Sequence, residues 1–192
     1  MFSCNSESRY VKRDGEWEWK HFHGGNFNFE YQKIDSVNHD RFSIISENYA
    51  KDDHNVFYKF SIIKNADLET FEVMERGYSK DKNNIFLDDE MVIFANPQSF
   101  KLLEFPYSKD SKRVFCGTIP LKLNENEAKE FSVTNTDKLL SRMKSSTLLS
   151  YFIKVNPEYK WLDTLNINGV IYGKGGTGET LNKKFKGFKE IE

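Results

Sequence analysis

A tetrapeptide that recurs at a fixed interval constrains the fold of this chain more than any other feature. It has the form Tyr-x-Lys-Asp and occurs at Tyr49–Asp52, Tyr78–Asp81 and Tyr107–Asp110, with 29 residues from one copy to the next. An apolar pair keeps the same phase behind each copy, at Val56-Phe57, Ile85-Phe86 and Val114-Phe115. A unit of this length cannot bury an aromatic face alone, so neighbouring copies must stack.

Each position in the repeat predicts a local structure. The alternation of Tyr-x-Lys-Asp is typical of a half-buried strand. The Asp then begins a hairpin turn whose last residue, Asn55 or Asn84, we expect in a left-handed conformation. Asp67 and Asn96 have the character of N-caps for a single helical turn before a short third strand. A Phe that follows each turn is expected among the most buried residues, at Phe42, Phe71, Phe100 and Phe131.

The two ends of the chain depart from the repeat. Tyr10–Asp14 has the character of a degenerate first copy. No Tyr follows Phe131 seven residues on, and the apolar spacing over 136–153 predicts a helix that covers the end of the stack. Residues 161–172 are then predicted to form a closing hairpin with its turn at 166–169.

The expected fold is therefore mainly β, an array of about four 29-residue hairpin, helical-turn and strand repeats capped by a C-terminal helix and hairpin. The predicted organisation has three parts. Residues 1–8 form a flexible N-terminal tether, residues 9–133 the repeat array, and residues 134–192 the C-terminal helix with a closing β and loop segment.

The repeat resembles the motif of the DKNYY family, a group of bacterial proteins of unknown function that are often exported lipoproteins. The segments that carry the resemblance are Tyr78–Phe86, Ala66–Phe71 and the opening Tyr10–Trp17 with His21–Gly25. The resemblance covers about residues 10–133 and departs at Ser111–Arg113, where the family has Lys-Asn-Asn. It implies a fold, and it brings no catalytic residues to this chain.

Composition excludes several classes of function. The chain has 28 basic and 29 acidic residues and a net charge of -1, so it lacks the basic footprint of a nucleic-acid-binding protein. No stretch approaches the 18 apolar residues that predict a membrane-spanning helix. Two cysteines do not make a disulfide framework, and Cys116 in its strand-like run is expected to be a buried thiol.

Three motifs suggest chemistry, and each has a simpler explanation. Gly173–Thr180 resembles the phosphate-binding loop of ParA-type ATPases, but Glu179 stands where that loop has its lysine and would repel phosphates. His21 and His23 on one strand face could begin a metal site, yet no further Cys or His completes a set. The Asp and Asn turns offer oxygens for calcium, and turn formation alone accounts for them. We therefore expect no catalytic residue, no cofactor and no metal.

The function predicted is that of a non-enzymatic binding protein of the bacterial cell envelope. Its partner is expected to be another protein, and an immunity-type protein that neutralises a secreted toxin is a narrower form of this hypothesis. The candidate contact residues are the aromatic side chains of Trp17, Trp19 and Trp161. A carbohydrate-binding module that uses the same side chains as stacking platforms is the alternative, as are a cytoplasmic protein of unknown function and an enzyme with an unrecognised site.

Cys4 is the candidate for lipid attachment. A small residue precedes it and Asn5–Ser8 follows it as a polar tether, which resembles the end of a lipoprotein signal. The hypothesis requires a signal peptide upstream of Met1, because the residues before Cys4 include no basic and no apolar region. With such a signal the protein is extracytoplasmic and anchored to the envelope through Cys4 alone, and without it the protein is cytoplasmic.

Overall fold

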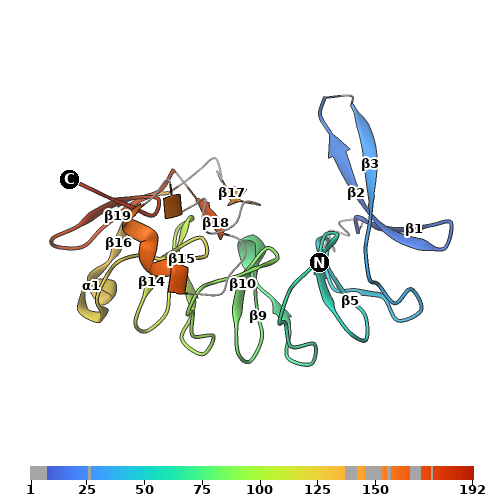
Figure 1. Cartoon of the computed structure of the whole chain (residues 1–192), viewed down its shortest axis with the longest axis horizontal. Coiled ribbons are helices and arrows are strands. Elements are labelled where there is room, and N and C mark those ends of the chain that lie inside the picture. The colour runs from blue at the N-terminus through green and yellow to red at the C-terminus, as the bar shows by residue number, and fades with distance from the viewer. Residues whose placement is uncertain are drawn as a thin grey trace, which may run out of the picture. The chain divides into compact units, whose positions relative to one another are not determined.

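Short antiparallel strands are the main regular elements of the structure, which confirms the prediction of a mainly β fold. The computed structural model describes residues 8–25, 27–136, 142–145, 153–154, 157–164, 170–173 and 175–192 (Figure 1). The chain divides into two compact units, Met1–Lys82 and Asn83–Glu192. None of the helices in the described ranges has the length and apolar character needed to cross a membrane.

The first unit holds two complete antiparallel sheets. One is ordered β1-β2-β3 and consists of β1 (Tyr10–Arg13), β2 (Glu16–His23) and β3 (Asn28–Lys33). The other is ordered β4-β5-β6-β7 and consists of β4 (Ser43–Ile44), β5 (Tyr49–Lys51), β6 (Val56–Tyr58) and β7 (Ser61–Ile62). A further pair follows, β8 (Glu72–Val73) with β9 (Tyr78–Lys80), and the 3-10 turn η1 (Glu75–Gly77) connects them.

The second unit repeats this pattern and then interrupts it. The pair β10 (Ile85–Leu87) and β11 (Glu90–Met91) precedes a sheet of β12 (Lys101–Leu102), β13 (Tyr107–Lys109), β14 (Val114–Cys116) and β15 (Ile119–Pro120). The helix α1 (Glu125–Glu130) leads to a last sheet of β16 (Ser132–Asn135), β19 (Thr177–Glu179), β20 (Lys184–Lys186) and β21 (Lys189–Ile191). Between β16 and β19 lie the pair β17 (Arg142–Ser145) with β18 (Val170–Gly173) and the 3-10 helix η2 (Pro157–Thr164).

The Asp of each tetrapeptide is buried, and the carboxylates of Asp52 and Asp110 each accept three backbone N–H groups. Oδ1 of Asp52 accepts from the amides of His54 at 2.7 Å and Asn55 at 2.6 Å, which closes the hairpin turn as predicted. Oδ2 accepts from the amide of Asn38 at 2.8 Å, fourteen residues earlier in the chain. In later copies Oδ2 of Asp81 accepts from the Asp67 amide at 2.8 Å, and Oδ2 of Asp110 accepts from the Asn96 amide at 3.0 Å. One side chain thus ties its own turn to the preceding one.

The tetrapeptide residues Tyr49 and Tyr107 connect one copy to the next. The hydroxyl of Tyr49 donates to the carbonyl of Gly77 at 2.8 Å, directly before the next copy begins, and its ring packs 5.8 Å from that of Phe71. Equivalent bonds run from Tyr10 to Asn48 at 2.8 Å and from Tyr107 to Gly176 at 3.1 Å. Burial raises the pKa of both Tyr10 and Tyr107, so these hydroxyls remain protonated donors.

The prediction that four Phe side chains are among the most buried is wrong for three of them. Phe42, Phe71 and Phe100 are half-buried, and only Phe131 is buried, at 5 % exposure. The fully buried Phe side chains of the regular copies lie instead in the return strands, at Phe57, Phe86 and Phe115. Phe57, for example, pairs opposite Ala50 inside a four-stranded sheet, whereas Phe42 only precedes an edge strand and covers the sheet from outside.

Turn conformations also differ from the prediction. Asn55 and Asn84 are not among the described residues with a positive φ, and the left-handed positions lie at the next turn, at Lys59, Asp88 and Gly117. Lys59, Asp88 and Gly117 follow one another at intervals of 29 residues, so the positive φ angle is itself part of the repeat. Asp67 caps its turn as expected, because its Oδ1 accepts from the Thr70 amide at 3.0 Å, but the turn is not helical.

A further copy of the repeat, which the sequence pattern did not predict, closes the chain. The pairing of β19 with β20 matches that of β13 with β14, with Gly178 opposite Phe185 where Ser108 lies opposite Phe115. Thr180 replaces the Asp, and its Oγ1 accepts from Lys183 N at 3.1 Å. The amide that the second Asp oxygen would hold is that of Asn124, which donates to Glu127 Oε2 at 2.8 Å in the capping box of α1. The Thr180 hydroxyl is therefore a sufficient acceptor in this copy, because Glu127 accepts the amide that the second Asp oxygen holds elsewhere.

The predicted helix over 136–153 is wrong at Arg142–Ser145, which form β17 and pair with β18. The alternation of polar and apolar residues in Arg-Met-Lys-Ser suits that pairing, which a helical interpretation of the apolar spacing overlooked. Most of the remaining residues of the predicted helix lie outside the described ranges, as does the predicted turn at 166–169. Residues 161–164 belong to η2, so the closing hairpin over 161–172 is also wrong.

Replacement of Gly178 by Ala tests the packing of the last copy. A Cβ at Gly178 would lie 2.2 Å from Cζ of Phe131, the one buried ring among the four predicted Phe side chains. Other copies have Ala50 or Ser108 at the position of Gly178, and their corresponding Phe is only half-buried. We expect Gly178→Ala to lower the free energy of unfolding by about 1–3 kcal/mol, as overpacking does. The control is Gly24→Ala, since nothing lies within 4 Å of that position. Equal stability of the two variants in urea denaturation would contradict this packing.

Candidate functional site

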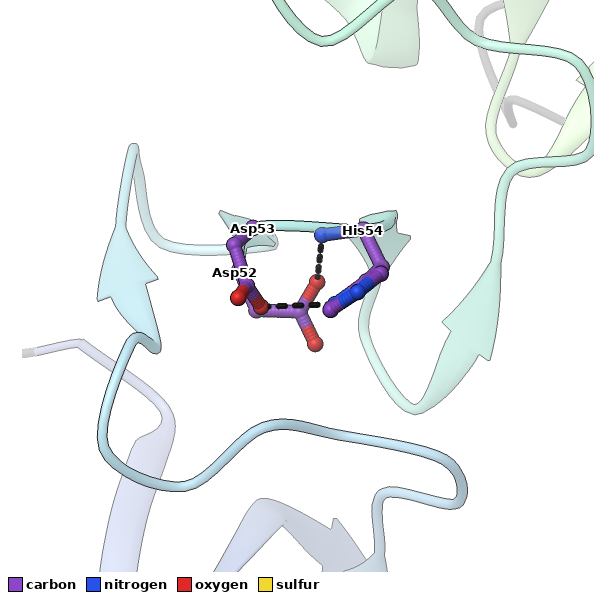
Figure 2. A group of neighbouring side chains, drawn as sticks. All are labelled: Asp52, Asp53 and His54. Carbon is purple, nitrogen blue, oxygen red and sulfur yellow. Dashed lines mark hydrogen bonds and ion pairs between the residues drawn. The ribbon is translucent and has the colours of Figure 1, made fainter.

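The turn after β5 brings Asp52, Asp53 and His54 together, with potential ligand atoms within 4.8 Å of one another (Figure 2). Both oxygens of Asp52 already accept backbone amides. Asp53 receives the side-chain amide of Asn38 at 3.0 and 3.1 Å and contacts His54 Nδ1 at 2.7 Å. Desolvation raises the pKa of Asp53, but the bonds from Asn38 and His54 outweigh it and leave that pKa below its usual value. The hydrogen bonds of the turn account for this cluster.

The two imidazoles of β2 both face Glu30 of β3. Nε2 of His21 lies 3.3 Å from one Glu30 oxygen and Nδ1 of His23 lies 3.8 Å from the other. His21 also stacks on Trp19, with ring centroids 5.5 Å apart and an interplanar angle of 17°. Within the described part of the chain, His21, His23 and Glu30 do not form a close group of metal-ligating atoms.

Two glycines of the segment 173–180, Gly176 and Gly178, have packing roles. A Cβ at Gly176 would lie 2.2 Å from Pro106, and Gly178 is pressed against Phe131. Thr177–Glu179 form β19, the second strand of the last sheet. The segment therefore lies in a strand and its turn, without the strand-to-helix geometry that phosphate-binding loops use.

The three tryptophans lie in the packed interior or against it. Trp19 is 5 % exposed, so the prediction that it contacts a partner does not fit its position. Trp17 is half-buried, packs 4.6 Å from the Phe42 ring and donates its indole N–H to the His39 carbonyl at 3.3 Å. Trp161 packs against the core of the second unit. Cys4 lies outside the described residues, and Cys116 is a buried thiol as predicted.

Exposed aromatic side chains gather instead on one side of the β2–β3 hairpin, which extends beyond β1 (Figure 1). We call Phe22, Phe27, Phe29 and Tyr31 the aromatic face; their exposed fractions are 53, 82, 55 and 40 %. The rings contact one another, with centroids of Phe22 and Phe29 5.7 Å apart and those of Phe22 and Phe27 6.4 Å apart. The result is a contiguous apolar surface in solvent.

Strand periodicity produces this surface. Phe22 pairs opposite Phe29 and Lys20 opposite Tyr31, so these four side chains share one side of the hairpin. The other side carries Trp17 and Trp19 into the core of the first unit. The tryptophans were predicted as contact residues because of their residue type. The alternation of side chains along β2 places Phe22 on the opposite side of the strand from Trp17 and Trp19, and this was the signal that separates the two sides.

Two cations border the aromatic face. The ammonium of Lys20 lies 4.2 Å from the centroid of the Phe29 ring, and the guanidinium of Arg13 lies 4.1 Å from that of Tyr31. Arg13 also pairs with Glu18 at 3.3 Å. The surface therefore combines apolar rings with positive charge, which is a composition found in protein interfaces.

A groove of about 650 Å³ lies in the second unit. Its aromatic walls are Phe94 and Trp161, and its polar groups include Arg113, Asn124 and Glu158. The guanidinium of Arg113 lies 5.4 Å from the Phe94 centroid. Such a groove offers both aromatic side chains and polar groups to a small ligand.

A model of the DKNYY family matches residues 9–90 of the chain, which confirms the predicted resemblance. The match includes the β1–β3 sheet and the aromatic face. No curated protein matches the chain, and no solved structure matches it.

Proposed function

From the match of residues 9–90 to the model of the DKNYY family, we propose that the chain is a non-enzymatic binding protein that contacts a partner protein through its aromatic face. The single observation that carries the proposal is the exposure of four adjacent aromatic rings on the β2–β3 hairpin. Aromatic side chains that stand in solvent gain free energy when a partner covers them, at about 25 cal/mol per Å² of apolar surface. Interface hot spots concentrate in such rings.

The chemistry of the face defines the partner. Lys20 and Arg13 border Phe29 and Tyr31, so a complementary surface carries apolar groups with carboxylates at its rim. Such carboxylates would increase the rate of association at low salt. A secreted toxin with an acidic surface around an apolar patch fits this description, and an immunity-type role is the narrower form of the proposal.

The location belongs to the proposal as well. Exported lipoproteins are frequent in the family that the repeat resembles, and Cys4 precedes the first strand by only a few residues. A lipid on Cys4 would hold the aromatic face near the membrane surface, where a partner from outside the cell arrives. Mass spectrometry of Cys4 in protein purified from native membranes tests this part independently.

The aromatic face is tested by capture of partners from the envelope fraction of the source cells. The variant Phe22→Ser/Phe29→Ser removes two exposed rings that make no core contact in either sheet, so we expect a native circular dichroism spectrum and at least a tenfold loss of the captured partner. Leu181→Ser is the matched control, because Leu181 is 83 % exposed but lies in the second unit. A partner that Phe22→Ser/Phe29→Ser still captures at the wild-type level would contradict the proposal.

A carbohydrate-binding function has one specific observation in its favour, the groove with Phe94 and Trp161. Sugar rings stack on aromatic side chains through their apolar faces, while their hydroxyls bond to groups such as Arg113, Asn124 and Glu158. A sugar-binding site in this groove would use Trp161, one of the predicted stacking platforms, but not Trp19, which is buried.

A glycan array with labelled protein distinguishes this second candidate. If the groove binds sugar, Arg113→Ala lowers binding about tenfold, because a charge-assisted hydrogen bond is lost. Arg41→Ala is the control, since Arg41 is exposed and lies outside the groove. An array without a hit, or equal binding by the two variants, would rule the candidate out.

A further inference from the structure

We propose that the outer edge of β3 pairs with β3 of a second copy, so that two chains join into a dimer through one continuous antiparallel sheet. In the described part of the chain, β3 is the end strand of its sheet and has no neighbour on its outer side. The inference concerns the backbone edge of β3, and it stands or falls independently of a partner on the aromatic face.

Hydrogen bonds within the sheet show which backbone groups of β3 point outward. The Ile34 amide donates to the Trp17 carbonyl at 3.2 Å, so Trp17 and Ile34 form a hydrogen-bonded pair. In an antiparallel ladder such pairs alternate with non-bonded ones. The N–H and C=O groups of residues 28, 30 and 32 therefore point toward β2, and those of Phe29, Tyr31 and Lys33 point away from the sheet.

Side-chain chemistry selects one register for two such edges. With Tyr31 opposite Tyr31 of the second copy, Phe29 lies opposite Lys33 and Glu30 lies opposite Gln32. A Lys beside Phe29 repeats a contact that the chain already makes, since Lys20 lies 4.2 Å from that ring. The outward backbone groups of Phe29, Tyr31 and Lys33 all find partners in this arrangement.

The alternative register about Glu30 is unfavourable. It places Glu30 opposite Glu30 of the second copy, and like charges directly opposite each other destabilise a sheet. It also leaves Lys33 opposite residue 27, beyond the end of the strand. The symmetric register about Tyr31 is therefore the longest one without a repulsive pair, and its two-fold symmetry is that of an isologous dimer.

The edge lacks several features that prevent such pairing. β3 contains no proline, its register with β2 is continuous from Asn28 to Lys33, and five of its six residues are exposed. Exposed strands of this kind accept an additional strand unless a bulge, proline or cover protects them. The joined sheet would place two aromatic faces side by side on one surface.

Sedimentation velocity over a concentration series tests the pairing through one backbone donor. Lys33→Pro removes an outward N–H that makes no bond inside the sheet, and proline is tolerated at such edge positions. Lys33→Ala removes the same charge but retains the N–H. Two donors are lost per dimer, so we expect Lys33→Pro to dimerise at least tenfold more weakly than Lys33→Ala. Equal dimerisation of the two variants, or a wild-type chain that is monomeric at every concentration, would overturn the proposal.

Cross-linking tests the register. In a Cys4→Ser background, Glu30→Cys on one chain lies opposite Gln32→Cys on the other, at a non-bonded pair whose Cα separation of about 4.5 Å permits a disulfide. The mixture of the two variants should give a disulfide-linked dimer that a reductant separates, while each variant alone should stay monomeric on a non-reducing gel. Cross-linking of Glu30→Cys alone would demonstrate the other register, and its absence from the mixture would overturn the proposed one.

Discussion

The structure depends on a buried carboxylate that holds three backbone amides. The strands of the repeat are two or three residues long, too short to be stable through their own ladders. Asp52 and Asp110 supply what the strands lack, because one oxygen closes the local hairpin and the other holds an amide from the preceding turn. Hydrogen bonds to an ionised group are about twice as strong as neutral ones. The carboxylate thereby joins elements that are close in space but separated in sequence.

The last copy shows how this requirement can be met in another way. There the chain inserts residues 136–176 between the two strands that would otherwise follow each other directly. Thr180 provides one acceptor instead of two, and Glu127 provides the other through the capping box of α1. The need for acceptors is unchanged, while the residues that provide them differ. A comparison of amino-acid identities alone therefore fails to detect this copy of the repeat.

Both candidate binding surfaces include residues from segments that depart from the repeat. The β2–β3 hairpin is longer than any hairpin of the regular copies and carries the aromatic face. Trp161, on the wall of the groove, belongs to the insertion before β19. Regular copies use most of their aromatic rings to bury one another, although Phe94 on the other wall of the groove belongs to them and is 49 % exposed.

The regular part of this fold could be predicted from the sequence because each of its positions has a local physical role. The Asp of the turn, the alternation of the strands and the capping role of Asp67 follow from spacing and side-chain chemistry. It could not be predicted that Phe131 alone of the four Phe side chains would be buried, since this depends on Gly178, which lies 47 residues later in the chain. The exposed face required knowledge of which side of β2 packs on the core, and that is set by tertiary contacts.

Amide hydrogen exchange in an Asp110→Thr variant tests the central role of the carboxylate most directly. The threonine retains one acceptor for the Lys112 and Arg113 amides, as Thr180 does in the last copy, but lacks the oxygen that holds the Asn96 amide. The account predicts that protection of the Asn96 amide falls at least tenfold while the amides of Lys112 and Arg113 remain protected. Unchanged protection at Asn96 would contradict it.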